Sequence, residues 1–479
     1  MENHISIQDK NSIPLVVDLD GSFLKTDLLV EGIILLVKRN FLYIFQFVFW
    51  LFRGKVFLKN KVFEKVQISY ESLPINQELY DFLLSESSKG RELILATASP
   101  KAEALKIEEI HRVFNEVYGS TEQLNLKGIN KKQLLVEKFG EKGFDYVGNS
   151  NADLIIFKSA RYAYLVNPAF FLEKRANKVS NVKKCWKTKR NSFFSFLKLI
   201  RIYQWVKNLL LFLPIITSHA FMELNNIKLV IIAFFAFGLI ASAGYIGNDI
   251  MDLNADRKHP RKKNRALASG KVSISTALVL SALFLFGGLT IAFLLNIQFF
   301  FILLVYFILS ITYSVVLKKY VLYDVFLLAL FYTIRVLAGG VVTGIPISFW
   351  LISFSIFIFL SLSFVKRYSE IFQIKTDVVS SRRGYTKVDI PLLQIMGIAC
   401  GFLSVIVFSL YINSPEVTLL YSKPHVLWII SLLLMFCISQ FWLITSRGKM
   451  TDDPIVYMMK DPTSFILLFL SAVTLYLAI

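Results

Sequence analysis

The sequence predicts two structural parts, an N-terminal α/β domain with a doubly wound parallel sheet and a C-terminal all-α membrane domain. The chain has 479 residues, 44 of them Phe, and a mean hydropathy of +0.56. This hydropathy is too high for a soluble enzyme, and the chain is too long for one domain. The apolarity is uneven, because strand-like and polar segments alternate at first and long apolar runs follow Phe193. We therefore expect the α/β domain at residues 1–180, a basic linker at 181–194 and the membrane domain at 195–479.

Nine transmembrane helices are predicted in the membrane domain, because nine apolar runs are each long enough to cross about 30 Å of hydrocarbon. They centre on residues 214, 238, 284, 308, 332, 357, 401, 435 and 471. The connectors after the second, fourth, sixth and eighth runs are rich in Lys and Arg, whereas the alternate connectors nearly lack them. By the positive-inside rule we expect the basic connectors and the N-terminal domain in the cytoplasm, with the chain in a bacterial inner membrane.

The sequence shows no pattern of a signal peptide and no cysteine or histidine motif. The chain opens on polar residues, so we expect no cleavable signal peptide. The three Cys and five His are scattered along the sequence, so we expect neither a disulfide framework nor a metal held by soft ligands.

Polar side chains follow the predicted strands of the N-terminal domain. The first strand ends in "DLDG", the second in "TAS", and a third, later strand leads into "GNSNAD". Because the carboxyl ends of parallel strands meet at one crevice, we expect these groups to lie close together. The residues concerned are Asp18, Asp20, Thr97, Lys127, Asn149 and Asp153.

This order of motifs resembles the haloacid dehalogenase (HAD) superfamily, whose phosphatases carry DxDGT/S, a hydroxyl, a lysine and GDxxxD. The resemblance covers about residues 13–170. It implies that Asp18 is a nucleophile that forms an aspartyl-phosphate, and that Asp20 is the general acid and base. It also implies that Thr97 and Lys127 bind the phosphoryl group.

The same resemblance implies a Mg²⁺ site formed by Asp18, the backbone of Asp20, Asp153 and the residue at position 149. Asn149 stands where the family usually has a metal-binding Asp, and an amide oxygen coordinates without charge, so we expect weaker Mg²⁺ binding. The alternative is a degenerate domain that is kept as a scaffold.

A helical cap is expected at about residues 28–80, where such phosphatases often carry one. Its first part, residues 28–55, is rich in aromatic residues but is interrupted by Glu31 and several cations. It could form the cap or lie on the bilayer surface with basic ends. A tenth span is disfavoured, because it would break the alternation of charge between connectors.

The connector after the second span, "NDIMDLNADRKHPRKKNRALASG" at residues 248–270, carries both signs of charge. If the span continues as a helix, Asp249, Asp252 and Asp256 project from one face. Three like charges repel unless a cation lies between them, and hard oxygen ligands favour Mg²⁺ with substrate phosphates. The alternative is that the acids form a solvated helix end and the cations are membrane anchors. Those cations are Arg257, Lys258, Arg261, Lys262, Lys263 and Arg265.

Further polar residues occur in or beside the other spans. Asp324 and Arg335 are close to three helical turns apart in the fifth span, so we expect them on one face. An arginine at that depth should face a polar cavity, unless it only forms a structural ion pair. Residues of three other spans, the first, fourth and sixth, are expected at the same membrane face: Lys207, Asn208, Tyr313, Lys318, Lys366 and Arg367.

The membrane domain resembles the UbiA superfamily of intramembrane prenyltransferases over about residues 195–479. The NDxxDxxxD motif is matched by Asn248 and the three aspartates of the connector, and YSxxLK is matched at residues 313–318. The segments "QWVKN", "IRVLAGG", "KRYSE" and "RRGYT" are similar to the decaprenyl-phosphate phosphoribosyltransferase branch. That branch transfers phosphoribose from 5-phosphoribosyl 1-diphosphate (PRPP) to a polyprenyl phosphate.

This second resemblance implies that PRPP binds through Mg²⁺ to Asp249, Asp252 and Asp256, which are the catalytic residues of this site. Asn248 and Asp324 are implied as further substrate-site residues. The HAD-like domain would remove the 5-phosphate from the product. We expect a membrane-embedded enzyme with no nucleic-acid partner, and a homo-oligomer is left open. The implied phosphate-binding residues are Lys207, Asn208, Arg257, Arg261, Lys262, Arg265, Tyr313, Lys318, Arg335, Lys366 and Arg367.

Three other functions stay open at this point. An aromatic-acceptor prenyltransferase with a regulatory or degenerate HAD domain would use the same acidic motif. A transporter would need broken helices and paired charges at mid-membrane, which the sequence does not show. A membrane-anchored phosphatase would leave the second acidic motif without a role.

Overall fold

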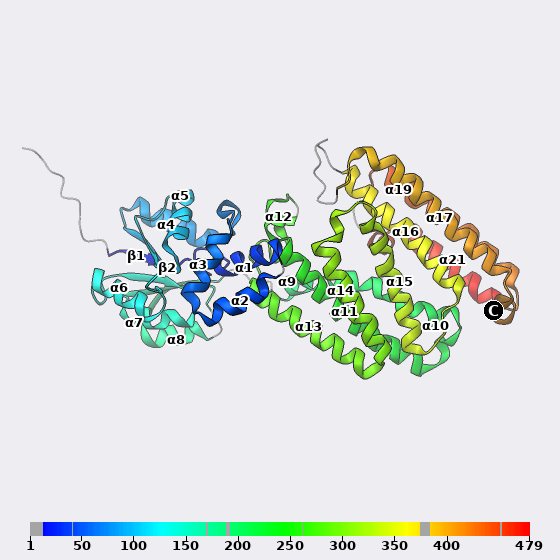
Figure 1. Cartoon of the computed structure of the whole chain (residues 1–479), viewed down its shortest axis with the longest axis horizontal. Helices are drawn as coiled ribbons and strands as arrows, with labels where there is room; N and C mark the ends of the chain where they lie inside the picture. The colour runs from blue at the N-terminus through cyan, green and yellow to red at the C-terminus, as the bar shows by residue number, and fades with distance from the viewer. Residues whose placement is uncertain are drawn as a thin grey trace, which may run out of the picture. The chain divides into compact units, whose positions relative to one another are not determined.

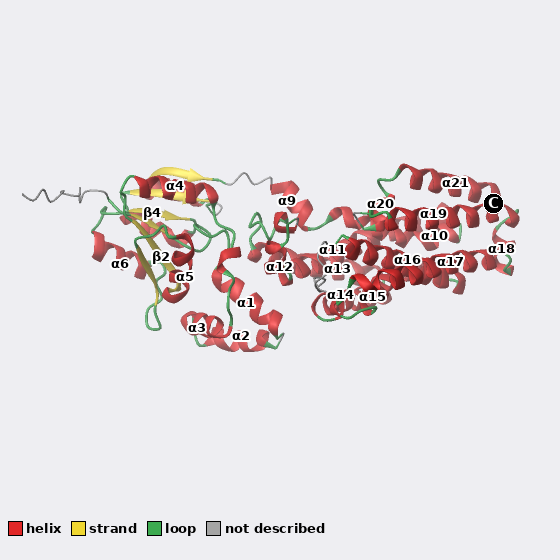
Figure 2. Cartoon of the chain, turned by 90° about the horizontal axis from the view of Figure 1, so that it is seen from above, coloured by secondary structure: helices red, strands yellow, loops and turns green. Residues whose placement is uncertain are grey.

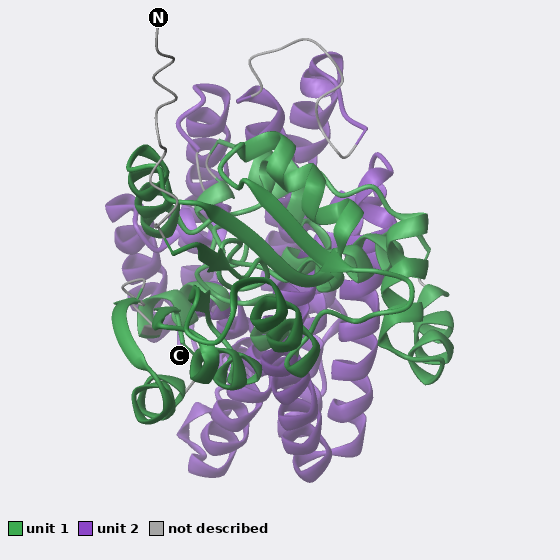
Figure 3. Cartoon of the chain, turned by 90° about the vertical axis from the view of Figure 1, so that its left-hand side faces the viewer, with its two compact units in different colours: residues 1–199, 249–278 green, residues 200–248, 279–479 purple. Residues whose placement is uncertain are grey.

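The computed structural model describes residues 13–40, 42–168, 171–187, 192–260, 262–373, 384–450 and 453–479. The chain divides into two compact units (Figure 3). Unit 1 comprises residues 1–199 and 249–278, and unit 2 comprises residues 200–248 and 279–479. The acidic connector therefore belongs to the same unit as the N-terminal domain, although we had expected it within the membrane domain.

Unit 1 contains a six-stranded parallel sheet in the order β3-β2-β1-β4-β5-β6. Because successive strands extend the sheet first to one side of β1 and then to the other, this is a doubly wound, Rossmann-like topology. The order reverses next to β1, whose carboxyl end faces the crevice where such sheets bind ligands. The strands are β1 (Leu15–Val17), β2 (Leu93–Pro100), β3 (Glu116–Ser120), β4 (Asp145–Gly148), β5 (Tyr162–Val166) and β6 (Asn181–Trp186).

Strand β6 corrects one expectation, because residues 181–186 were predicted to begin a linker. They pair with β5, and Trp186 is buried against Phe82 and Tyr164. Lys183 and Lys184 are exposed on this edge strand, where lysines discourage pairing with another chain. The lysines that indicated a linker therefore belong to an edge strand, which they protect from pairing with another chain.

Both faces of the sheet carry an apolar core, because successive strand residues point to opposite faces. Leu15 and Val17 belong to one core, whereas Val16 belongs to the other. Helices cover both faces (Figure 2). The helices of the sheet domain are α4 (Gln77–Ser88), α5 (Lys101–His111), α6 (Ile129–Phe139), α7 (Leu154–Ser159) and α8 (Leu172–Val179).

The predicted cap is an all-helical segment between β1 and α4. It consists of α1 (Leu28–Arg39), α2 (Tyr43–Phe52) and α3 (Lys55–Lys65). Trp50, Leu58, Val62 and Leu36 form a small core of its own. Unit 1 also contains α9 (Ser192–Leu199), α12 (Leu253–Lys258) and the first residues of α13.

Unit 2 is entirely helical in the residues that the structure describes (Figure 1). Its main elements are a 3₁₀ segment at Ile202–Phe212 and the helices α10 (Leu213–Thr217), α11 (Leu224–Met251), α13 (Ile274–Leu295), α14 (Ile297–Val315), α15 (Tyr323–Thr343), α16 (Phe349–Phe372), α17 (Ile390–Ile412), α18 (Pro415–Leu420), α19 (Trp428–Ser446), α20 (Pro454–Met458) and α21 (Pro462–Ala478). The ends of α11 and α13 lie at the division between the units.

Seven of the described helices are long and apolar enough to cross a membrane, and a bent pair at residues 193–217 would make eight. The predicted number of nine is therefore not confirmed. The difference lies at the two ends of the bundle. The first predicted span is that bent pair, and the last is α21, a shorter apolar helix.

Helix α15 contributes to two of the apolar cores of unit 2. Val336 belongs to one core and Ala338 to the other. Gly339 lets the 3₁₀ segment approach α15 closely, since a Cβ at this position would lie 2.2 Å from the carbonyl oxygen of Leu211. This approach brings polar residues of the 3₁₀ segment beside those of α15.

Candidate functional site

The carboxylate of Asp18 lies directly after β1 and is bonded to a lysine. Lys131 Nζ donates to Asp18 Oδ1 at 2.7 Å, and also to the Ala96 carbonyl and the Tyr146 hydroxyl. Burial raises the pKa of Asp18 to about 6, the charge of Lys131 opposes that rise, and nearby Asp153 adds to it. An ionised Asp18 therefore depends on a neighbouring cation.

Asp20 is held by the cap and by β2. Its Oδ1 accepts from the backbone N–H of Leu28 at 2.9 Å, and its Oδ2 accepts from the hydroxyls of Ser99 at 2.7 Å and Thr97 at 3.4 Å. Burial raises the pKa of Asp20 to about 7, and the negative charge of Asp27 contributes further. A carboxyl group of this kind can carry a proton at neutral pH and exchange it with a substrate.

Asp153 and Asn149 lie in the loop after β4, beside Asp18. Asp153 Oδ2 accepts from the backbone of Asn149 and from the backbone and hydroxyl of Ser150, at 2.8–3.2 Å. Gly21, with φ +77°, is so close to the loop that a Cβ there would lie 2.1 Å from the Asn149 amide nitrogen. The predicted metal ligands are thus neighbours.

The fit to Mg²⁺ at this site is partial. The described residues include no group of three or more His, Cys, Asp or Glu side chains that could hold a metal ion. Asp18 and Asp153 still repel each other, as the raised pKa of Asp18 indicates. Two carboxylates and the Asn149 amide oxygen would be the ligands, and a hard cation would relieve that repulsion.

These groups line a cavity of about 520 Å³ within unit 1. The cap contributes Lys59, whose Nζ donates to the Ala98 carbonyl and whose pKa is lowered by burial. Lys127, the lysine predicted to bind phosphate, lines the cavity, but Lys131 is the lysine that donates to Asp18. Apolar cap residues form part of the wall: Leu29, Val30, Ile33, Phe47 and Leu51.

The acidic connector differs in local structure from the predicted continuous helix. Helix α11 ends at Met251, and Asp252 is the N-cap residue of the separate helix α12. Asp249 and Asp256 nevertheless converge. Arg265 Nη1 lies 3.0 Å from Asp249 Oδ1 and 2.6 Å from Asp256 Oδ2.

The space between these two carboxylates suits a cation, because one positively charged nitrogen already bridges them. Asp256 is 2% exposed, and its Oδ1 has no hydrogen-bond partner among the described residues. Mg²⁺ in proteins is usually coordinated by one or two carboxylates and by water, and substrate phosphates complete its coordination. Two carboxylates at this position fit that pattern. Asp249 and Asp256 would be the ligands, and Asp252, which is half-buried, would lie next to them in sequence.

The connector cations do not all have the predicted role. Arg257 donates to Glu31 of α1 with two nitrogens, at 3.1 and 2.6 Å, so its guanidinium is occupied by protein. Lys262 begins a short 3₁₀ turn whose first N–H bonds to His259 Nδ1. Arg261 lies outside the described residues.

A cluster of opposite charges lies inside unit 2. Lys207 Nζ and Lys366 Nζ lie 2.7 and 3.0 Å from Asp453 Oδ2, and the Tyr332 hydroxyl lies 3.4 Å from its other oxygen. Burial alone would raise the pKa of Asp453, but the two lysines hold it below its usual value. Two cations therefore share one carboxylate. We call Lys207, Lys366 and Asp453 the lysine cluster.

Arg335 and Asp324 lie on the same helix, α15, but they form hydrogen bonds and ion pairs with different residues. Arg335, which is 2% exposed, donates to Asn208 Oδ1 and to the Tyr306 hydroxyl, each at 3.0 Å, and to the Phe331 carbonyl. It also lies 4.6 Å from the centre of the Phe237 ring. Its surroundings are thus hydrogen-bond acceptors and aromatic rings, as a buried guanidinium requires.

Asp324 instead pairs with Arg367 of α16 at 2.5 Å, and accepts from the Tyr385 hydroxyl at 2.6 Å. Neither charged side chain is more than 1% exposed. Arg367 also contacts Glu370. This pair has the character of a structural ion pair, and the predicted phosphate-binding role of Arg367 would require it to open.

The two sequence motifs of the UbiA resemblance meet at one hydrogen bond. Lys318 Nζ donates to Asn248 Oδ1 at 3.3 Å. Tyr313 packs its ring against Phe331, with ring centres 5.8 Å apart. The structure thus brings residues of the first and second motifs together within unit 2.

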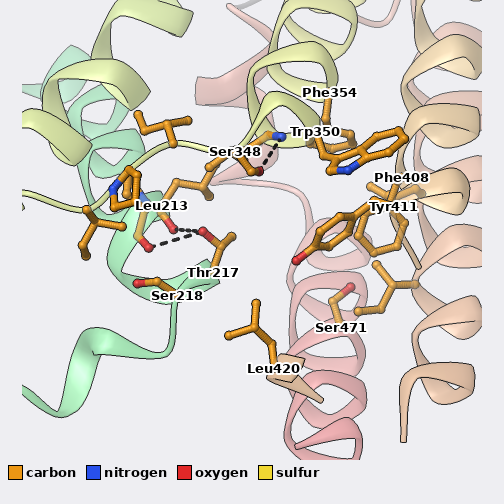
Figure 4. A pocket seen from close by; sticks show the side chains of 17 residues that line it. Leu213, Thr217, Ser218, Ser348, Trp350, Phe354, Phe408, Tyr411, Leu420 and Ser471 are labelled. Carbon is orange, nitrogen blue, oxygen red and sulfur yellow. Dashed lines mark hydrogen bonds between the residues drawn. The ribbon is translucent and has the colours of Figure 1, made fainter. Parts of the chain in front are cut away.

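Unit 2 also has an apolar cavity of about 380 Å³ (Figure 4). Leu213 and Thr217 of α10, Trp350 of α16 and Phe408 and Tyr411 of α17 line it. The Thr217 hydroxyl bonds back to the Leu213 carbonyl, so this wall presents little unsatisfied polarity. None of the described residues that line the cavity is charged.

Several functional candidates were missed by the sequence reasoning. Lys131 lies in the first turn of α6, whereas Lys127 precedes that helix, and Lys131 is the one that reaches Asp18. Asp453 lies in a connector that had been read only for its Lys and Arg content. Glu31 interrupts an apolar run, and a carboxylate in such a run is itself a signal for a charged partner, which is Arg257.

Comparison with known proteins places the chain in a family. The UbiA prenyltransferase family matches residues 211–460, more than half of the chain. An uncharacterized protein of Sinorhizobium fredii, y4nM, is 33% identical over 95% of this chain and 88% of its own length. A decaprenyl-phosphate phosphoribosyltransferase of Mycobacterium tuberculosis is 34% identical over 36% of this chain and 59% of its own length.

A solved structure of a UbiA homolog from Archaeoglobus fulgidus, bound to GPP and Mg²⁺, is 18% identical, covers 58% of this chain and 96% of that chain, and has a TM-score of 0.43. The apolar helices and the family match together identify a multi-pass membrane protein. The chain belongs to the UbiA prenyltransferase family.

Proposed function

We propose that the protein transfers 5-phosphoribose from PRPP to a polyprenyl phosphate, with Mg²⁺, at the cytoplasmic face of a bacterial inner membrane. The observation that carries the proposal is the convergence of Asp249 and Asp256 on one cationic atom of Arg265. This arrangement suits a metal-bound diphosphate flanked by a guanidinium. The similarity to the phosphoribosyltransferase of Mycobacterium tuberculosis supports the choice of phosphoribose.

Bound Mg²⁺ would draw negative charge onto the leaving diphosphate. In the proposed reaction Asp249 and Asp256 hold the metal, and Arg265 turns from them to the diphosphate oxygens. A phosphate oxygen of the lipid attacks the anomeric carbon of the ribose, and the bond from that carbon to the diphosphate breaks. The nucleophile is already anionic, so no histidine base is needed. The two lysines of the lysine cluster would hold the lipid phosphate.

We further propose that unit 1 removes the 5-phosphate from this product. Asp18 attacks phosphorus, the bond to the ribose oxygen breaks, and Asp20 gives that oxygen its proton. Asp20 then takes a proton from the water that hydrolyses the aspartyl-phosphate. Lys131 is placed to stabilise the transferred charge, because it already donates to Asp18. The apolar wall contributed by the cap suits a substrate that is attached to a lipid.

The test follows radiolabel from PRPP into lipid. Purified protein in detergent is incubated with Mg²⁺, a polyprenyl phosphate and labelled PRPP, and the lipid fraction is analysed. We expect labelled lipid from the wild type, none from Asp256→Asn, and a lipid that keeps its 5-phosphate from Asp18→Asn. Glu223→Gln, which changes an exposed acid of another connector, is the matched control and should behave as wild type.

The outcomes separate the two proposals. Labelled lipid without a change in Asp18→Asn would support the transferase and reject the phosphatase. If no lipid is labelled, but a prenyl diphosphate and an aromatic acid are consumed, phosphoribose transfer is rejected. Membership of the UbiA prenyltransferase family would still stand.

A further inference from the structure

A buried ion pair joins the cap of unit 1 to the acidic connector. Arg257 Nη1 and Nη2 lie 3.1 and 2.6 Å from the two carboxylate oxygens of Glu31. The Glu31 and Arg257 side chains are 2% and 4% exposed. Thr26 donates its hydroxyl to Glu31 at 2.6 Å, and the Arg257 Nε donates to the Ala268 carbonyl. The pair is therefore fixed by hydrogen bonds on both sides.

On the cap side, the pair is one helical turn from the candidate phosphatase site. Helix α1 begins at Leu28, whose N–H donates to Asp20, and Asp27 caps the same helix end. Glu31 lies on the next turn. A shift of α1 along its axis would move the N–H that holds Asp20.

On the connector side, the pair is adjacent to the candidate metal ligands. Asp256 immediately precedes Arg257 and is bridged to Asp249 by Arg265. The connector then runs on to Ser273 and Ser275, which line the cavity that contains Asp18 and Asp20. One connector thus carries the acidic motif and builds a wall of the phosphatase cavity.

We propose that Glu31 and Arg257 are positioning residues for both reactions. The ion pair holds Asp256 in the place required for metal-bound PRPP, and it holds α1 in the place required by Asp20. A buried ion pair is a weak source of stability but a strict constraint on geometry, because breaking it leaves an unpaired buried charge. This inference rests on the proposed function and adds that a residue of the phosphatase cap sets PRPP binding.

The test measures both activities in the full-length protein. Phosphoribose transfer is followed with labelled PRPP, and phosphatase activity with p-nitrophenyl phosphate. We expect Glu31→Gln to raise the KM for PRPP about tenfold with a smaller change in kcat, a typical size for coupling between sites. We expect Arg257→Gln to lower phosphatase activity, and Arg257→Lys to restore part of it. Glu64→Gln, which removes the exposed ion pair of Glu64 with Lys61 in the same cap, is the matched control.

A merely structural role predicts a different result. Loss of folded protein would lower kcat for both activities together and leave the KM for PRPP unchanged. That outcome, or a wild-type KM for PRPP in Glu31→Gln, would overturn the inference. Failure of the proposed function would be recognised separately, because the wild type itself would then label no lipid.

Discussion

At the residue scale, Lys131 and Lys127 differ in what they can do for Asp18. Lys131 Nζ is 2.7 Å from the Asp18 carboxylate, whereas Lys127 only lines the cavity. We expect Lys131→Met to lower phosphatase kcat by about 100-fold, because a preorganised charge at the reacting phosphoryl group is lost. Lys127→Met should mainly raise KM. Steady-state kinetics of both variants with p-nitrophenyl phosphate checks this, and equal loss of kcat would contradict it.

A second residue-scale prediction concerns Asp324 and Arg367. Their ion pair is almost completely buried, so removal of one partner leaves an uncompensated charge. We expect Asp324→Asn to destabilise unit 2 by about 3–5 kcal/mol. Tyr385→Phe removes one hydrogen bond to Asp324 and should cost only about 1 kcal/mol. Thermal unfolding in detergent gives the order of the two midpoints, and a smaller effect of Asp324→Asn would contradict the prediction.

At the element scale, α2 has more exposed apolar residues than a soluble surface explains. Phe45, Phe49 and Phe52 are 69%, 56% and 87% exposed, and Arg53 lies over the Phe49 ring. A short aromatic helix with a basic end has the character of a helix that lies in the membrane interface. Helix α2 lies in the helical segment after β1 and presents an apolar face, so both sequence interpretations of this segment stay predictions.

The membrane contact of α2 can be measured with a spin label at Phe52→Cys in a variant that lacks the three native cysteines. We expect the label to be more accessible to oxygen than to a water-soluble nickel complex in vesicles, since oxygen concentrates in the bilayer. Glu78→Cys, on the exposed side of α4, is the control and should show the reverse preference. Similar accessibilities at both positions would place α2 in water.

At the scale of the whole molecule, the two units do not follow the order of the sequence. Residues 249–278 belong to unit 1 although they interrupt unit 2. A fragment that ends at residue 199 therefore lacks Arg257, and it also lacks Gly270, which packs closely against Lys25. We expect α1 to exchange its amide hydrogens faster in this fragment than in the full chain, because Glu31 loses its partner.

Hydrogen exchange followed by mass spectrometry tests this expectation. The central strands β1, β2 and β4 serve as the internal control, since their cores lie within residues 13–199. They should stay equally protected in fragment and full chain. Equal protection of α1 would show that the connector does not stabilise the cap.

The local pattern of the sequence determined the elements and the chemistry they carry. The β1 strand with Asp18 and Asp20, the apolar helices and the acidic connector all follow from periodicity and from residue type. These features depend on near neighbours in the chain, so the sequence alone contains them. The predicted count of nine spans is not confirmed, because the first apolar run forms a bent pair of helices and α21 is a shorter apolar helix.

Only the tertiary structure decided which charged groups are partners. Lys131 rather than Lys127 reaches Asp18, Arg367 rather than Arg335 pairs with Asp324, and Arg257 pairs with Glu31. Each pair joins residues that are far apart in the sequence, and many cations could have served each acid. The choice depends on helix starts, on close approaches such as that at Gly339, and on the burial that makes an unpaired charge costly. These properties arise only when the whole chain is packed.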